Sequence, residues 1–277
     1  MIPRIIHQTA PSNKEEWMPV WYTCQESWKK TFRGFEYMFW TDENLKDLVT
    51  SEYPNYLYLY ESYPVNICRV DIARAMILHK YGGIYADMDI YCLSDFYSEL
   101  QDGISIVEAC HWDENLSNSL MVSDKENHGW IELLDYAKYI FFNTDMGADL
   151  AEFTKGRDGG PFLRRDYPVG DMPGDPKIGE HRVSQYVKQL TGPGLMNYML
   201  SKCNILPKEK FNPGFCDSTW DKTENVYTKH LLTNKWADGV THIKHQIEKT
   251  LMNKECYASV SGEMNDFIKS IDKGWEV

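Results

Sequence analysis

The sequence has little positive charge. It carries 29 Lys and Arg residues against 41 Asp and Glu residues, which gives a formal net charge of −12 at pH 7. A surface this acidic repels nucleic acid and anionic membranes, so neither is expected as a partner. It also repels a free nucleotide, unless a divalent metal or local arginines offset the field.

The chain also lacks paired cysteines and long apolar runs. Its seven cysteines are widely spaced, and none belongs to a Cys-x-x-Cys pair. An odd number of scattered cysteines indicates reduced thiols in a cytosol-like compartment. The segment from Met1 to His7 is too short an apolar stretch for a signal peptide, and no later run is long enough to span a bilayer. We therefore expect a cytoplasmic protein with no membrane span.

No internal repeat, low-complexity tract or obvious linker divides the chain, so we expect a single domain over residues 1–277. Apolar patterning predicts strands at Ile5–His7, Phe35–Trp40, Ile84–Ala86, Ile90–Cys92, Ile104–Val107 and Leu120–Val122, and helices at Trp17–Lys30, Asn66–Tyr81 and Trp130–Phe142. Their alternation predicts an α/β fold with a central mixed sheet flanked by helices.

Other segments are less regular. Thr41 or Asp42 is expected to cap a short helix, and Tyr53–Tyr63 is an aromatic-rich stretch between prolines. Thr144–Lys188 is dense in Gly and Pro and predicts a loop-rich insertion, either a lid or acceptor-binding segment or a surface loop without a role. Roughly the last 25 residues are expected to form a terminal helix.

The run that ends in Asp87 and Asp89 says most about function. Helix Asn66–Tyr81 stops at two glycines, and the short strand Ile84–Ala86 then leads directly into the two aspartates. Ligands bind at strand ends in α/β sheets, and two carboxylates there suit Mg²⁺ or Mn²⁺ bridging two phosphates. A lone Asp-x-Asp also occurs in solvated turns of acidic proteins, but this context favours a metal site.

Asp71 and Arg74 lie three residues apart, so they share one face of the same helix. A structural ion pair is one interpretation of this spacing. The alternative is functional: an aspartate in an apolar helix needs a partner. Arg74 would hold it and still offer N–H donors to a phosphate or a sugar hydroxyl.

These motifs resemble the glycosyltransferase family that contains an Asp-x-Asp sugar-binding region. They are similar to family 32-like proteins, such as yeast initiating mannosyltransferases and bacterial capsular polysaccharide glycosyltransferases, and more distantly to the glucosylating domains of large clostridial toxins. The matching segments are Ile2–Thr9, Arg69–Arg74, Tyr81–Asp89, Asn118–Ser123 with His128, Thr191–Pro193, Ile205–Pro207 with Phe211–Pro213, and His230 with Trp236.

The resemblance implies a GT-A-like fold and a metal-dependent, retaining glycosyltransferase. Such an enzyme moves a hexose from a nucleotide-diphosphate sugar donor to a glycan or other hydroxyl acceptor, as in polysaccharide biosynthesis. Mn²⁺ or Mg²⁺ is the implied cofactor. A cytoplasmic setting in a bacterial cell or a virus-infected host cell agrees with the absence of an apolar leader.

The resemblance also implies roles for individual residues. The metal ligands would be Asp87, Asp89 and His230, and the catalytic residues would be Asp71, Arg74, Asp87 and Asp89. The substrate-binding residues would be Gln8 and Thr9 at the base, Asp71 and Arg74 at the sugar and phosphate, Asp87 at the ribose, Lys235 and Trp236 at the diphosphate, and Tyr85 and Asn118.

Two departures from the family pattern keep alternatives open. Ala10 stands where many relatives have Trp, which leaves the identity of the base open, and Asn234 and Lys235 precede Trp236 where relatives have His-Ser. An inactive nucleotide-sugar or glycan-binding protein is therefore the main alternative. A metal phosphohydrolase would need more ligand clusters than the sequence offers. His242 and His245 are interpreted as structural.

Overall fold

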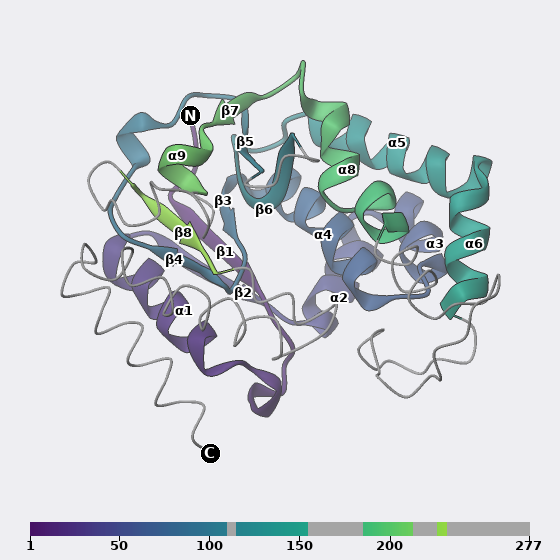
Figure 1. The fold of residues 1–277 in the computed structure, drawn as a ribbon, viewed down its shortest axis with the longest axis horizontal. Helices are drawn as coiled ribbons and strands as arrows, with labels where there is room; N and C mark the ends of the chain where they lie inside the picture. Colours follow the sequence, from purple (N-terminus) through teal and green to yellow (C-terminus); the bar gives the residue numbers. More distant parts are fainter. Residues whose placement is uncertain (110–114, 155–184, 213–225, 232–277) are drawn as a thin grey trace, which may run out of the picture.

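A mixed β-sheet forms the centre of the structure (Figure 1). The computed structural model describes residues 1–109, 115–154, 185–212 and 226–231. Within them the sheet has six strands in the order β2-β1-β3-β6-β5-β7. The strands are β1 (Ile5–Thr9), β2 (Glu36–Trp40), β3 (Gly83–Ala86), β5 (Ile104–Glu108), β6 (Leu116–Ser123) and β7 (Asn204–Leu206). β1 runs parallel to β2 and β3, whereas β6 runs antiparallel to β3 and β5. The predicted α/β class with a central mixed sheet is confirmed.

A second, small sheet lies beside the end of β3. It pairs β4 (Ile90–Cys92) with β8 (Thr228–His230) in antiparallel fashion, and Ile90 lies opposite His230. Figure 1 shows this pair next to β3 and α1. Residues near the end of the described chain are therefore brought next to the residues that follow β3.

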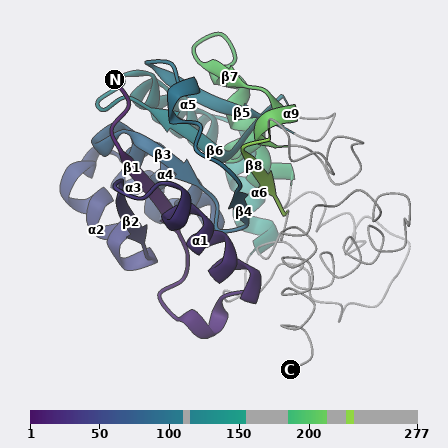
Figure 2. The ribbon, with the colours of Figure 1, turned by 90° about the vertical axis from the view of Figure 1, so that its left-hand side faces the viewer.

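Helices cover both faces of the central sheet (Figures 1 and 2). One face carries α1 (Pro19–Thr31), and the other carries α2 (Asp42–Glu52), α3 (Pro54–Ser62), α4 (Asn66–Tyr81), α5 (Gly129–Asn143) and α6 (Asp145–Thr154). The short helices α8 (Pro193–Met196) and α9 (Lys208–Phe211) follow later in the chain, and 3-10 turns occur at Lys14–Glu16, Tyr97–Glu99 and Asn197–Met199. The site described below lies at the end of β3, between the helices of the two faces.

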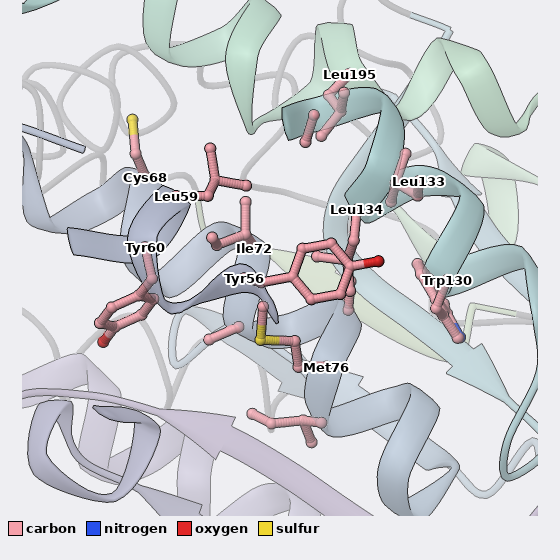
Figure 3. Packing of buried hydrophobic residues seen from close by; sticks show 14 of the residues in the cluster. Tyr56, Leu59, Tyr60, Cys68, Ile72, Met76, Trp130, Leu133, Leu134 and Leu195 are labelled. Atoms are coloured by element: carbon pink, nitrogen blue, oxygen red, sulfur yellow. The ribbon is translucent and has the colours of Figure 1, made fainter. Parts of the chain in front are cut away.

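The larger hydrophobic core surrounds α4 (Figure 3). Ile72 and Met76 of α4 pack among side chains of α3, α5 and α8. The residues that Figure 3 labels on these three helices are Tyr56, Leu59, Tyr60, Trp130, Leu133, Leu134 and Leu195. A separate cluster fills the α1 face and includes Ile6, Trp28 and Ile84. Residues 71–78 of α4 are all buried, so the polar groups of Asp71 and Arg74 are held in place.

The local sequence explains the bounds of α4 and β3. α4 begins and ends where the apolar spacing predicts, and Gly82 at its C-terminus has φ 65°. Gly83 follows with φ 94°, and a Cβ there would lie 2.6 Å from the carbonyl oxygen of Ile5. Only glycine tolerates both the backbone angle and the close approach of β1. The two glycines therefore let β3 start directly beside β1.

Other predictions meet mixed outcomes. Thr41 caps α2 through a reciprocal capping box with Asn44, as expected. The aromatic stretch after Tyr53 forms helix α3, although its sequence pattern predicted neither a helix nor a strand. β6 starts four residues before the predicted strand at Leu120; apolar patterning missed its first half because Leu116 is followed there by three buried polar residues, Ser117, Asn118 and Ser119.

Some predictions fall partly or wholly outside the described residues. The first part of the predicted insertion forms α6, whereas residues 155–184 and the expected terminal helix are not described. Four cysteines lie within the described ranges, and each carries a free thiol: Cys24, Cys68, Cys92 and Cys203. Among the helices of the described residues, none combines the length and apolarity that a bilayer crossing requires.

Candidate active site at the Asp87–Asp89 turn

Asp87 and Asp89 lie on a tight turn between β3 and β4. The backbone N–H of Ile90 donates to the carbonyl oxygen of Asp87 (3.1 Å), which closes the turn. The N–H of Asp87 donates to Ser119 of β6 (2.8 Å), and the carbonyl of Asp89 accepts from the N–H of Leu231 (2.9 Å). Strands on both sides therefore fix the backbone that carries the two carboxylates.

His230 joins the two aspartates. Asp87, Asp89 and His230 each offer one ligand atom, and these atoms all lie within 4.8 Å of one another. The Nε2 atom of His230 lies 3.2 Å from Oδ1 of Asp89. The structure thus brings together the three residues that the family resemblance names as metal ligands, although His230 is far from the others in sequence.

The chemistry of this group fits a divalent cation. Two carboxylates and one imidazole are a donor set that accepts Mn²⁺ or Mg²⁺. Burial raises the pKa of Asp87, although the guanidinium of Arg74 opposes the rise. Burial lowers the pKa of His230, but the carboxylate of Asp89 outweighs it and the net shift is upward. Neighbouring carboxylates contribute to both upward shifts, and a bound cation would offset their negative charge.

Arg74 connects this group to the interior of α4. Its guanidinium lies 3.0 Å from Oδ1 of Asp87 and 3.3 Å from Oδ1 of Asp71, and it donates to the carbonyl oxygen of Asn118 (3.2 Å). The side chain is 7% exposed, and its Nε atom is buried with no hydrogen-bond partner. The ion pair with Asp71 that the helical spacing indicates is present. Arg74 also extends to the Asp87–Asp89 turn, which spacing alone did not show.

Asp71 is enclosed by hydrogen-bond donors. Its Oδ1 accepts from Nδ2 of Asn118 (3.0 Å), and its Oδ2 accepts from the hydroxyl of Thr191 (3.0 Å). Burial raises the pKa of Asp71 to about 7, although the guanidinium of Arg74 opposes the rise. Asn118 was expected among the substrate-binding residues, and here its side chain contacts Asp71. Thr191 was noted within a family motif but was not named as a site residue.

Tyr85 and Thr9 orient the carboxylate of Asp87. The hydroxyl of Tyr85 donates to Oδ1 of Asp87 (2.8 Å), and the hydroxyl of Thr9 lies 2.8 Å from that of Tyr85. Since a tyrosine has one hydroxyl proton, Thr9 is the donor in the second bond. The centre of the Arg74 guanidinium lies 5.0 Å from the centroid of the Tyr85 ring. Asp87 therefore receives both a neutral donor and a charged donor on one oxygen.

Gln8 approaches the same turn from the other face of the sheet. It is fully buried, its Nε2 donates to the carbonyl oxygen of Asp87 (3.2 Å), and its Oε1 accepts from the hydroxyl of Tyr37 (2.6 Å). A contact of Gln8 or Thr9 with a base stays a prediction. Lys235 and Trp236 lie outside the described residues, as do His242 and His245.

Residues 19–108 match the sequence model of a family described as "Glycosyltransferase sugar-binding region containing DXD motif". This region contains Asp71, Arg74, Asp87 and Asp89. The predicted resemblance to this glycosyltransferase family is therefore confirmed for about the N-terminal third of the chain, which is the part that carries most of the site.

Curated proteins with similar sequences carry related names. Inositol phosphoceramide mannosyltransferase 3 of Schizosaccharomyces pombe is 45% identical over 91 residues, which are 33% of this chain and 25% of that protein. Mannosyl phosphorylinositol ceramide synthase CSH1 of Saccharomyces cerevisiae is 38% identical over 94 residues, 33% of this chain and 24% of that protein. Uncharacterized glycosyltransferase L373 of Acanthamoeba polyphaga mimivirus is 36% identical over 100 residues, 35% and 40% respectively. The similarity spans less than half of each relative.

Solved glycosyltransferase structures are distantly similar. PaToxG Glycosyltransferase aligns with a TM-score of 0.44 and 15% identity, over 73% of this chain and 69% of that chain. A glycosyltransferase involved in the glycosylation of the major capsid of PBCV-1 aligns with a TM-score of 0.42 and 10% identity, over 90% and 100%.

Proposed function

We propose that this protein is a glycosyltransferase that moves a hexose from a nucleotide-diphosphate sugar to a hydroxyl group of a glycan or another acceptor. A divalent cation, Mn²⁺ or Mg²⁺, assists the transfer, and the configuration at the anomeric carbon is retained. The observation that carries the proposal is the meeting of Asp87, Asp89 and His230 beside the buried guanidinium of Arg74. The match of residues 19–108 to a sugar-binding region supports it.

The reaction breaks the bond between the anomeric carbon and a diphosphate oxygen, and negative charge gathers on the leaving phosphate. Asp87, Asp89 and His230 would hold a cation, which when bound would supply Lewis-acid stabilisation of that charge. Arg74 adds a permanent positive charge from a buried position, where electrostatic stabilisation is strongest.

Asp71 is a poor candidate for a covalent nucleophile. Both of its oxygens accept hydrogen bonds, from Asn118 and Thr191, and Arg74 lies against it. Donors that hold a carboxylate on both oxygens lower its readiness to attack carbon. The family resemblance implies attack from the face that the leaving group departs from, and we propose this route to retention: the acceptor hydroxyl forms the new C–O bond and its proton passes to the departing phosphate oxygen.

The names of the relatives suggest which sugar the donor carries. Two of the proteins compared above are named for mannosyl transfer, so mannose is the first sugar to test. Ala10 is buried and packs in a small cluster with Trp17, Trp21 and Met88. Because no assignment of the base follows from this cluster, both uridine and guanosine diphosphate sugars belong in the panel.

Release of nucleoside diphosphate from a panel of sugar nucleotides with Mn²⁺ tests the proposal. Asp89→Asn is expected to lower turnover by at least about a hundredfold, because the substitution removes a charged ligand and its stabilisation of the leaving group. The exposed Asp47 on α2 provides the matched control Asp47→Asn, which is expected to leave turnover unchanged. Equal turnover in both variants would reject the assignment.

A binding protein without activity remains the second candidate, favoured by Ala10 and by the sequence that precedes Trp236. It predicts donor binding that Mn²⁺ strengthens, with no nucleoside diphosphate released over many acceptors. Thermal shift with each sugar nucleotide in the presence of Mn²⁺, followed by product analysis, separates the two functions.

A further inference from the structure

β1 holds β3 at both ends through two adjacent side chains. The Nε2–H of His7 donates to the carbonyl oxygen of Gly82 before β3 (2.8 Å), and the Nε2 of Gln8 donates to the carbonyl oxygen of Asp87 after β3 (3.2 Å). Each of these side chains also accepts a hydrogen bond from β2. Trp40 donates to His7 Nδ1 (3.2 Å), and Tyr37 donates to Gln8 Oε1 (2.6 Å).

Both side chains are closed off from solvent, so their polar atoms depend on partners inside the protein. His7 and Gln8 are both fully buried, and burial lowers the pKa of His7 to about 4, which keeps its ring neutral. A buried amide that lost its hydrogen-bond partners would destabilise the folded protein. An apolar residue would fill the space of Gln8 without that cost. The presence of an amide at this position is therefore explained by its hydrogen bond to the backbone of the Asp87–Asp89 turn.

The hydrogen bond from Gln8 reaches the carbonyl oxygen that closes the Asp87–Asp89 turn. The carbonyl oxygen of Asp87 also accepts the N–H of Ile90, the hydrogen bond that closes the turn. Gln8 lies on the same face of β1 as Ile6, which belongs to the α1-side cluster. Tyr85 and Arg74 hold the Asp87 carboxylate from the opposite, α4 side. The turn is thus fixed from one face through its carboxylate and from the other through its backbone.

We propose that Gln8, held by Tyr37, is a positioning residue for the cation site: it fixes the Asp87 carbonyl and thereby sets the separation of the Asp87 and Asp89 carboxylates. The inference rests on the proposed function in one respect, because it takes the ligand of this turn to be a divalent cation. It assigns Gln8 a role through another residue and no contact with substrate.

Two substitutions remove the bonds with little change in shape. Gln8→Met keeps the length of the side chain and removes both hydrogen bonds, and Tyr37→Phe removes only the hydroxyl that holds Gln8. Tyr97→Phe is the matched control, because the Tyr97 hydroxyl donates to the carbonyl oxygen of Ile2 (2.5 Å), on the same side of the sheet and away from the turn. All three are made in the full chain.

Mn²⁺ affinity, measured from the electron paramagnetic resonance signal of free Mn²⁺, is the first readout. Gln8→Met is expected to weaken binding about tenfold, as loss of a residue that orients metal ligands does. Tyr37→Phe is expected to weaken it about threefold, since Gln8 keeps its bond to Asp87 but loses its own support. Tyr97→Phe is expected to bind Mn²⁺ as the unmodified protein does.

Hydrogen exchange at the amide of Ile90, measured without metal, is the second readout. Gln8→Met is expected to speed this exchange, whereas Tyr97→Phe is not. If Gln8→Met lowers only the melting temperature and leaves Mn²⁺ affinity and Ile90 exchange as in Tyr97→Phe, Gln8 is merely structural and the proposal is overturned. If the unmodified protein binds no Mn²⁺, the proposed cation site fails, and Ile90 exchange alone then decides whether Gln8 fixes the turn.

Discussion

Arg74 contacts two carboxylates, and the fold treats them differently. The side chain of Asp71 is 5% exposed and accepts hydrogen bonds from Asn118 and Thr191, whereas that of Asp87 is 22% exposed and lies within reach of Asp89. Hydrogen-bond donors of the protein enclose the carboxylate of Asp71, whereas the carboxylate of Asp87 lies beside a second carboxylate, that of Asp89. Partnership with the same arginine therefore does not define a role; the surroundings of each carboxylate do.

The largest expected effect is the loss of the charge that serves both carboxylates. Arg74→Met should destabilise the protein by about 3–5 kcal/mol, because removing one partner of a buried ion pair leaves the other charge uncompensated. Urea unfolding measures the change. Arg69→Met on the same helix is the control, since Arg69 donates to the carbonyl oxygens of Tyr60 and Tyr63 and forms no ion pair within the described residues. An equal loss in both variants would contradict the central place given to Arg74.

The difference between the two carboxylates predicts opposite responses to Mn²⁺. A cation that binds only the folded protein stabilises it by about 2.7 kcal/mol at a hundred times its dissociation constant. This stabilisation should persist in Asp71→Asn and disappear in Asp87→Asn, as measured by thermal unfolding with and without Mn²⁺. If Mn²⁺ still stabilised Asp87→Asn, or no longer stabilised Asp71→Asn, the different roles given to the two carboxylates would be contradicted.

Thr191 tests how far the enclosure of Asp71 depends on a distant segment. Thr191→Val removes the hydroxyl that Asp71 accepts from, and the unpaired oxygen should lower stability by about 1–3 kcal/mol. Thr191→Ser retains the hydroxyl and is expected to lose clearly less. Urea unfolding measures the free energy of unfolding of the two variants. If valine is tolerated as well as serine, the hydroxyl is not needed to hold Asp71.

The smallest expected effect is a pH dependence at His230. Its pKa in the folded protein is raised above the ordinary value of 6.5, against burial, by the carboxylate of Asp89. A histidine with a raised pKa stabilises the folded state fully below about pH 6.5, and this stabilisation is lost as pH rises through the folded pKa. The stability difference between the metal-free protein and His230→Gln should therefore shrink above pH 6.5. A constant difference from pH 5 to 9 would count against the contact with Asp89.

Local patterns in the sequence predicted the part of the site that lies between Arg69 and Asp89. The apolar spacing and the two glycines located α4 and β3, and the three-residue spacing of Asp71 and Arg74 indicated their ion pair. These features depend on neighbours within one or two turns of chain. His230 was identified only through the family resemblance, because no local pattern links it to Asp89.

The remaining partners depend on contacts between distant segments. Thr191 bonds to Asp71 across 120 residues and Gln8 bonds to Asp87 across 79, and neither spacing leaves a periodic signal. The start of β6 was missed for a related reason. Ser117, Asn118 and Ser119 show no apolar pattern that predicts a strand, yet they are buried and form hydrogen bonds inside the protein.

The pairing of β4 with β8 has a consequence for biosynthesis. Both aspartates leave the ribosome long before His230, so a nascent or truncated chain that ends ahead of β8 displays two acidic groups without the imidazole opposite them. Such a fragment contains the residues that match the family model, 19–108, but lacks one member of the candidate metal site. Recombinant versions cut to the matched region would retain the recognisable motif and lose His230.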